Sequence, residues 1–80
     1  MGSNKALQAR QGQRFAKKLR EAREASGLSQ EAVARAMGRG QRFVSRCEQA
    51  DRRVDAVEFR DFCRVFKLPP GFFIEGLPES

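Results

Sequence analysis

Apolar residues recur at helical spacing along most of the chain, and no segment alternates apolar and polar residues in the way of a strand. Phe15, Leu19 and Ala22 stand at i, i+4 and i+7, which predicts a first helix over residues 13–25. Gly27 follows as the residue type that most often ends a helix. The pattern therefore predicts an all-helical fold that begins with this amphipathic segment.

Two short helices, joined by a turn that contains glycine, are predicted next. Ser29 is a good N-cap for the second helix, because its hydroxyl can accept from an otherwise unpaired backbone N–H. Gly38-Arg39-Gly40 then breaks that helix, and a third helix is expected over residues 41–49. Two short helices connected in this way form the unit called helix-turn-helix.

The strongest periodic pattern lies in the C-terminal half of the chain. Asp55 followed by Glu58 has the spacing of a capping box and predicts the start of a fourth helix. The apolar stripe of that helix consists of Phe59, Phe62, Cys63 and Phe66. Residues 68–71 include two prolines and end it. A short fifth helix or turn should follow, with a hydrophobic cluster that closes the core, forms a self-complementary patch for a two-fold dimer, or does both. The residues of this possible dimer patch are Phe72, Phe73, Ile74 and Leu77.

The chain of 80 residues has room for one domain with one modest core. We expect a flexible N-terminal arm over residues 1–11, because this stretch is polar and precedes the first periodic segment. A helix-turn-helix domain should occupy residues 12–77, with a tail over 78–80. The sequence predicts one compact all-helical bundle of about five short helices.

The charge balance points to a polyanionic partner. The net charge is +6, the isoelectric point is near 10.4, and twelve of the sixteen basic residues are arginine. A nucleic acid or an anionic membrane surface would suit such a chain. The arginines do not segregate opposite one long apolar face, which disfavours the membrane surface. The sequence contains neither a bilayer-spanning apolar run nor the pattern of a signal peptide, so we expect a cytoplasmic protein.

Several kinds of chemistry are disfavoured by the residue types. Histidine is absent, and Cys47 and Cys63 both fall at apolar helix positions, where core thiols are expected rather than a disulfide or a metal pair. No nucleophile, base and orienting group converge, and no phosphate-binding loop appears. We therefore expect no enzymatic activity, no cofactor and no bound metal.

The third helix has two faces of different character. Phe43, Val44 and Cys47 fall on one side, whereas the opposite side is polar and has no carboxylate. A DNA major groove admits one α-helix, arginine can pair with both acceptors of guanine, and glutamine can pair with adenine. The candidate base-reading residues are Gln41, Arg42, Ser45 and Arg46.

Other residues around this helix are suited to the DNA backbone. Gln30 opens the second helix, Gly40 leaves the first backbone N–H groups of the third helix available, and three arginines flank that helix. Contacts of this kind position a protein without reading the sequence. The candidate phosphate-binding residues are Gln30, Arg39, Gly40, Arg52 and Arg53.

From Phe15 to about Leu68 the chain resembles the phage-repressor-like helix-turn-helix family, also called the xenobiotic-response-element type. The resembling stretches are LREAR over 19–23, GLSQEAVA over 27–34, FVSRCE over 43–48 and RRVDAVEF over 52–59. The resemblance implies a bundle of about five helices and sequence-specific binding of operator-like DNA, usually as a homodimer on a palindrome. It assigns a phosphate contact to Gln30 and base reading to the outward face of the third helix. It also implies an ion pair between Arg23 and Glu48 that joins the first and third helices.

The chain departs from the family pattern after the third helix. Many relatives have glycine where Ala50 stands here, so we expect the exit of that helix to be less strained or differently shaped. The hypothesis from the whole sequence is a sequence-specific regulator that binds double-stranded DNA, with repression as its expected mode. The alternative is an antitoxin-type module that binds a partner protein as well as its own operator.

Overall fold

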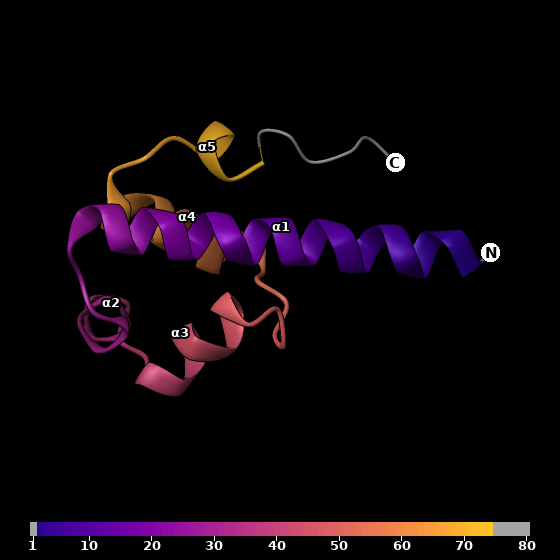
Figure 1. Cartoon of the computed structure of the whole chain (residues 1–80). Helices are drawn as coiled ribbons and strands as arrows, with labels where there is room; N and C mark the ends of the chain where they lie inside the picture. The colour runs from indigo at the N-terminus through magenta and orange to yellow at the C-terminus, as the bar shows by residue number, and fades with distance from the viewer. Residues whose placement is uncertain (1, 75–80) are drawn as a thin grey trace.

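The computed structural model describes the backbone of residues 2–74 and the side chains from residue 12 to residue 74. Within that range every regular element is an α-helix. The helices are α1 Gly2–Ser26, α2 Gln30–Ala36, α3 Gln41–Glu48, α4 Ala56–Phe66 and α5 Pro70–Ile74. Helix α1 is central, because α3, α4 and α5 all contact it, and α2 packs against α3 (Figure 1). The predicted all-helical bundle of about five helices is confirmed.

Local sequence determines where the short helices begin. The Ser29 hydroxyl accepts from the backbone N–H of Ala32 at 3.0 Å and caps α2. Asp55 and Glu58 form the predicted capping box at the start of α4, since each side chain accepts from the other residue's backbone N–H. Gly38 has a φ of 69° in the turn between α2 and α3, a conformation that glycine adopts without steric cost. The helix-turn-helix unit therefore follows from caps and turns encoded locally.

The core lies where the five helices meet, and phenylalanine dominates it. The buried members of the main cluster are Leu19, Ala22, Val33, Ala34, Phe43, Val44, Cys47, Phe62, Phe66 and Phe73. Phe73 has no exposed surface, and four other aromatic rings lie 5.1 to 6.3 Å from it between centroids. Offset and edge-to-face ring contacts at such distances add to the free energy of apolar burial. Phe73 thus packs α5 against both α1 and α4.

The hydrophobic cluster of α5 divides between core and surface. Phe73 belongs to the core, and Phe72 is half-buried beneath the Lys18 ammonium, which lies 4.9 Å from the ring centroid. Ile74 is 51% exposed. Leu77 lies outside the described residues. Of the predicted dimer patch, Ile74 offers the most apolar surface among the three described members.

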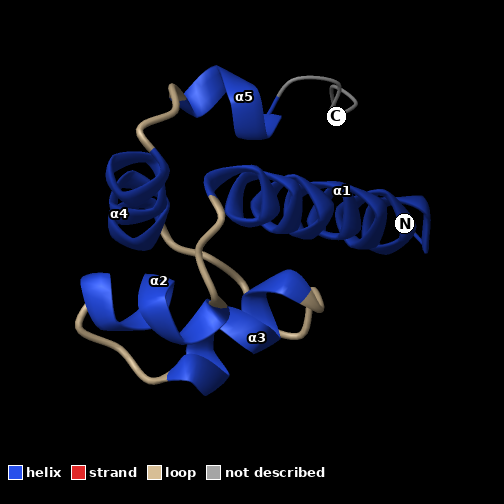
Figure 2. Cartoon of the chain, turned by 60° about the vertical axis from the view of Figure 1, so that its left-hand side comes forward, coloured by secondary structure: helices blue, strands red, loops and turns tan. Residues whose placement is uncertain are grey.

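Helix α1 begins much earlier than the sequence pattern predicted. Residues 2–11, predicted as a flexible arm, are helical and continue α1 past the other helices (Figures 1 and 2). Residues 3–11 contain no proline or glycine and include strong helix formers such as Ala6 and Leu7. Extending an existing helix adds one hydrogen bond per residue, so polarity alone does not end it, and Gly12 in the helix interior is tolerated. The predicted boundary at residue 12 is therefore not a break in the backbone.

Candidate nucleic-acid interface

Helix α3 turns its apolar side to the core and its polar side to solvent. Phe43, Val44 and Cys47 are buried. Gln41, Arg42 and Arg46 are exposed, and Ser45 is half-buried and accepts from the Gln49 side-chain amide at 3.4 Å. The structure thus gathers the four predicted base readers on one face of one helix. Gly40 caps this helix without a side-chain hydrogen bond.

A chain of hydrogen bonds runs from the interior to the first residue of α3. Glu48 accepts two hydrogen bonds from the Arg23 guanidinium, at 2.7 Å from Nε and 3.1 Å from Nη2. The Gln30 amide donates to Glu48 Oε1 at 3.2 Å, and its own oxygen accepts from Gln41 Nε2 at 3.5 Å. Gln30 therefore connects the interhelical ion pair to an exposed residue of the polar face.

The ion pair between Arg23 and Glu48 is largely shielded from solvent. The Glu48 side chain is 5% exposed and that of Arg23 is 16% exposed. The hydrogen bond to Glu48 raises the pKa of Arg23 above its ordinary value, although desolvation acts in the opposite direction. The Arg23 guanidinium also donates to the Leu28 carbonyl at 3.2 Å. Glu48 is thus the acid that α3 turns inward, and the contact joins α1 to α3 as the resemblance implied.

A second buried carboxylate, Glu58 on α4, binds two of the predicted phosphate-binding arginines. Arg39 Nη1 donates to Glu58 Oε2 at 3.0 Å, and Arg52 Nη1 donates to Glu58 Oε1 at 2.7 Å. The hydrogen bond from Arg52, helped by those from the Asp55 backbone and from Arg39, lowers the pKa of Glu58 to about 2. Glu58 therefore remains ionised and ties both loops that flank α3 to the first turn of α4.

The ring of Phe43 packs against the guanidinium groups of both arginines. The guanidinium carbons of Arg39 and Arg52 lie 4.0 and 4.8 Å from its ring centroid. Its ring also stacks on Phe62, with centroids 5.9 Å apart and planes 8° from parallel. Only 8% of Phe43 is exposed, so it belongs to the packing of α3 against α4. The sequence pattern placed Phe43 beside the core, but it did not reveal the cation–π contacts.

The exit of α3 keeps the shape that glycine usually provides. Ala50 has a φ of 61°, in the left-handed region, and the next backbone N–H, that of Asp51, donates to the Arg46 carbonyl at 2.9 Å. The expected relief of strain at Ala50 is therefore wrong. An L residue with a Cβ in this conformation costs about 1–2 kcal/mol, which the packing around the turn must offset.

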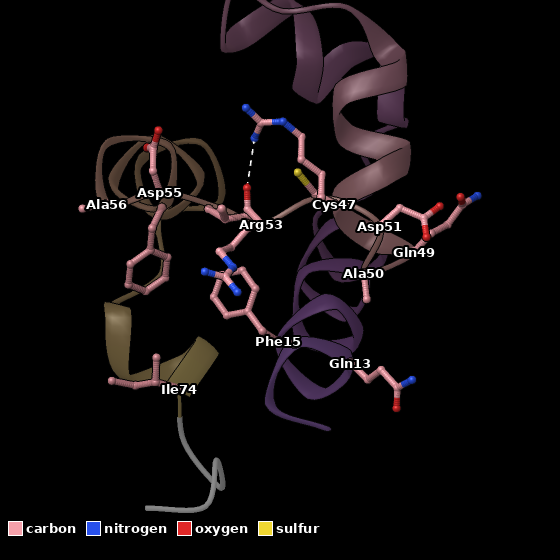
Figure 3. A pocket seen from close by; sticks show the side chains of 14 residues that line it. Gln13, Phe15, Cys47, Gln49, Ala50, Asp51, Arg53, Asp55, Ala56 and Ile74 are labelled. Carbon is pink, nitrogen blue, oxygen red and sulfur yellow. Dashed lines mark hydrogen bonds between the residues drawn. The ribbon is translucent and has the colours of Figure 1, made fainter. Parts of the chain in front are cut away.

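A cavity of about 1030 Å³ lies beside the C-terminal end of α3, bordered by α1, α5 and the loop to α4 (Figure 3). Its lining mixes apolar and charged groups: Phe15 from α1, Ile74 from α5, and Asp51 and Arg53 from the loop. Arg53 is exposed, and its carbonyl accepts from Arg52 Nη1 at 3.2 Å. The segments that form this cavity are far apart in the sequence, so no local pattern could indicate it.

The other sequence expectations concern metals and membranes. Among the described side chains, no cluster of three potential metal ligands from histidine, cysteine, aspartate or glutamate occurs. None of the helices in residues 2–74 combines the length and the apolar character needed to cross a bilayer.

Comparison with known proteins identifies the family of the chain. A family model described as a helix-turn-helix domain matches residues 14–71, which is most of the sequence. The match begins in α1 and ends in the first turn of α5, so it includes α2, α3 and both buried carboxylates. No curated protein matches the chain.

Proposed function

The chain belongs to the helix-turn-helix domain family, and we propose from this premise that it is a sequence-specific transcriptional regulator, acting as a repressor, that reads double-stranded DNA with α3. The observation that carries the proposal is the exposed polar face of α3. Its two arginines, Arg42 and Arg46, suit guanine edges, and Gln41 suits adenine. The one acid of this helix, Glu48, is bound to Arg23 and does not face outward.

The fixed position of α3 supports base reading over a general electrostatic role. Sequence reading requires side chains that are held within about 0.5 Å of the positions from which they can bond the base edges. The Arg23–Glu48 contact fixes α3 against α1, and the Glu58 contacts fix the loops on either side of it. Such a helix enters the major groove as one rigid element, and a repressor of this kind acts by occupying its operator.

Phosphate contacts would set the register of α3 in the groove. Gln30 at the start of α2 and the backbone N–H groups after Gly40 are suited to one strand, and Arg53 reaches solvent from the loop after α3. Arg39 and Arg52 complete the proposed set of phosphate-binding residues.

We propose a homodimer on a palindromic site as the working form. Ile74 is 51% exposed and lines the cavity, and Val57 on α4 is 57% exposed. A two-fold axis through the surface around Ile74 or around Val57 would bring one of these exposed side chains against its own copy, and dimers of this class bind half-sites about one helical turn apart.

An antitoxin-type module is the second candidate function. The cavity beside α3 and the exposed side chain of Ile74 would also accept an apolar segment of a partner protein. The two candidate functions differ in what covers this surface: a second copy of the chain in the regulator, or a partner protein in the antitoxin-type module. Both include binding to an operator.

Selection of sites from a random duplex library at about 0.15 M salt tests the proposed function, because nonspecific binding is weak under these conditions. We expect a palindrome with half-sites about one helical turn apart. A folded protein that enriches no site would contradict operator binding, which both candidate functions include, and would leave binding of a partner protein as the role to test.

The Arg46→Ala variant tests base reading on the selected site. We expect its affinity for that site to fall by about 1–3 kcal/mol, and its affinity for random duplex to fall much less. Arg64→Ala, which removes an exposed arginine from α4, is the matched control and should bind both duplexes like the parent. Equal losses by Arg46→Ala on the two duplexes would exclude a base-reading role.

A further inference from the structure

Two arginines from opposite ends of α3 meet at one carboxylate. Arg39 precedes the cap of α3 and Arg52 follows its end, yet the two bind different oxygens of Glu58, at 3.0 and 2.7 Å. The Glu58 side chain is 9% exposed, whereas those of Arg39 and Arg52 are 40% and 35% exposed. The carboxylate is therefore buried, and the two guanidinium side chains are partly exposed at the surface.

The geometry restrains each guanidinium in two directions. Glu58 accepts from one edge of each group, and the Phe43 ring lies 4.0 and 4.8 Å from their central carbons. Phe43 cannot move away, because it is 8% exposed and stacks on Phe62. The long, rotamer-rich side chains of Arg39 and Arg52 have thus lost much of their freedom before any ligand binds.

The restrained arginines still have donors to offer. A guanidinium has five N–H donors, and the contacts with Glu58 use a single nitrogen, Nη1, of each arginine. Two cations outweigh one carboxylate, so the cluster keeps a net positive charge. The backbones of Arg39 and Arg52 lie at opposite ends of α3, but both guanidinium groups meet at Glu58 over the Phe43 ring, so the cluster is a single cationic site beside this helix.

Two effects of Glu58 on DNA binding oppose each other. Its negative charge repels phosphates, but it is buried and is matched by two nearer cations, so its field at the surface is weak. Its hydrogen bonds hold Arg39 and Arg52 in place, which removes the entropy cost of ordering them when DNA binds. The second effect is larger because it acts on two flexible side chains at once.

We propose that Glu58 is a positioning residue for DNA binding, which orients Arg39 and Arg52 so that their remaining N–H donors contact the phosphate backbone at one place beside α3. This inference rests on the proposed function. It assigns to an acid a favourable contribution to binding a polyanion, which net charge alone would not predict.

The test compares Glu58→Gln with Glu31→Gln on the selected duplex over a range of salt concentrations. Glutamine keeps the length of Glu58 and an acceptor for the capping box, but it binds the arginines weakly. Glu31 is exposed on α2 and pairs with Arg35, so its substitution removes the same charge without touching the cluster. Thermal melting of each variant establishes that it is folded at the temperature of the binding assay.

We expect Glu58→Gln to bind about tenfold more weakly, and the slope of log affinity against log salt to fall by about 0.9 for each phosphate that the variant no longer binds. Glu31→Gln should bind as tightly as the parent or more tightly. Tighter binding by Glu58→Gln would mean that the acid only repels DNA. Weaker binding with an unchanged salt slope would mean that Glu58 acts through the position of α3 and not through phosphate contacts of Arg39 and Arg52. Either result overturns the inference.

A charge-conserving variant covers the case in which Glu58→Gln does not fold. Glu58→Asp keeps the carboxylate but shortens its reach toward Arg39 and Arg52, so we expect weaker binding and a smaller salt slope at unchanged net charge. Parental affinity and slope in this variant would overturn the inference. In the Arg39→Ala/Arg52→Ala background, Glu58→Asp should change binding no further, and a further decrease would also overturn it.

Binding by the parent protein distinguishes failure of the proposed function from failure of the inference about Glu58. A parent that enriches no DNA site defeats the proposed function and this inference together. A parent that binds its site, with Glu58 variants that behave like Glu31→Gln, defeats this inference alone.

Discussion

Glu48 and Glu58 are both buried acids that fix α3, but they do so in different ways. Glu48 is matched by one arginine, Arg23, whose side chain is 16% exposed. Glu58 is matched by Arg39 and Arg52, whose side chains are 40% and 35% exposed. If Glu48 is removed, its partner stays inside without an anion. If Glu58 is removed, its partners can turn to water. The first contact therefore serves the docking of helices, and the second serves the order of surface cations.

The largest expected effect on stability is that of Glu48→Ala. Removing one member of a buried ion pair typically costs 3–5 kcal/mol, and we expect about 3 kcal/mol because Arg23 keeps its hydrogen bond to the Leu28 carbonyl. For a domain of this size, thermal melting should show a Tm lower by more than about 10 °C. The double variant Arg23→Ala/Glu48→Ala should be destabilised by less than the sum of the two single effects. An unchanged Tm for Glu48→Ala would show that the ion pair does not contribute to the stability of the fold.

Glu58→Ala should have a smaller effect on stability. The variant loses the hydrogen bond from the Asp55 backbone N–H to the Glu58 carboxylate, keeps the N-cap hydrogen bond of Asp55, and releases two arginines that can hydrate. We expect a decrease of about 1–2 kcal/mol in the free energy of unfolding, measured by denaturant titration. A decrease as large as that of Glu48→Ala would mean that the exposure of the partner cations does not distinguish the two sites.

How well the sequence predicted the contacts of each acid depends on how far apart the partners are in the sequence. Glu58 was expected only as a helix cap, since its spacing from Asp55 is local. Its contacts with Arg39 and Arg52 span 19 and 6 positions and exist only after the turn and the loop have folded around Phe43. The Arg23–Glu48 pair, 25 positions apart, was accessible through the family resemblance and not through spacing.

The same distinction applies to the rest of the fold. Caps and turns such as Ser29 and Gly38 are decided by neighbouring residues, and the sequence predicted them. The full burial of Phe73 depends on four rings from three helices, so the pattern could not separate core from surface in α5. The helical start at Gly2 was missed because polarity was interpreted as flexibility, although propensity favours a helix there.

Acid should weaken the contribution of Glu58 specifically. Its pKa in the folded protein is about 2, below the ordinary value of 4.5, so it stabilises the fold above pH 4.5 and this contribution disappears as pH falls toward 2. The stability difference between the parent and Glu58→Gln should therefore narrow over this range. We expect the narrowing to be about 1 kcal/mol, because solvent screens Arg39 and Arg52, and melting at several pH values measures it. A stability difference between the parent and Glu58→Gln that stays constant from pH 5 to pH 2 would show that the ionised form of Glu58 does not stabilise the fold.

The smallest effect on stability is expected for an ion pair in which both side chains are exposed. Arg20 and Glu24 lie 3.6 Å apart on α1, with side chains 64% and 58% exposed. Glu24→Gln should change the free energy of unfolding by at most about 0.5 kcal/mol, since water hydrates the released arginine and an acid near the C-terminal end of a helix opposes its dipole. The three acids then form a series in which the cost of removal follows the burial of the partner cation. A Glu24→Gln variant as unstable as Glu58→Ala would break that series, because charge pairing and not burial would then set the cost.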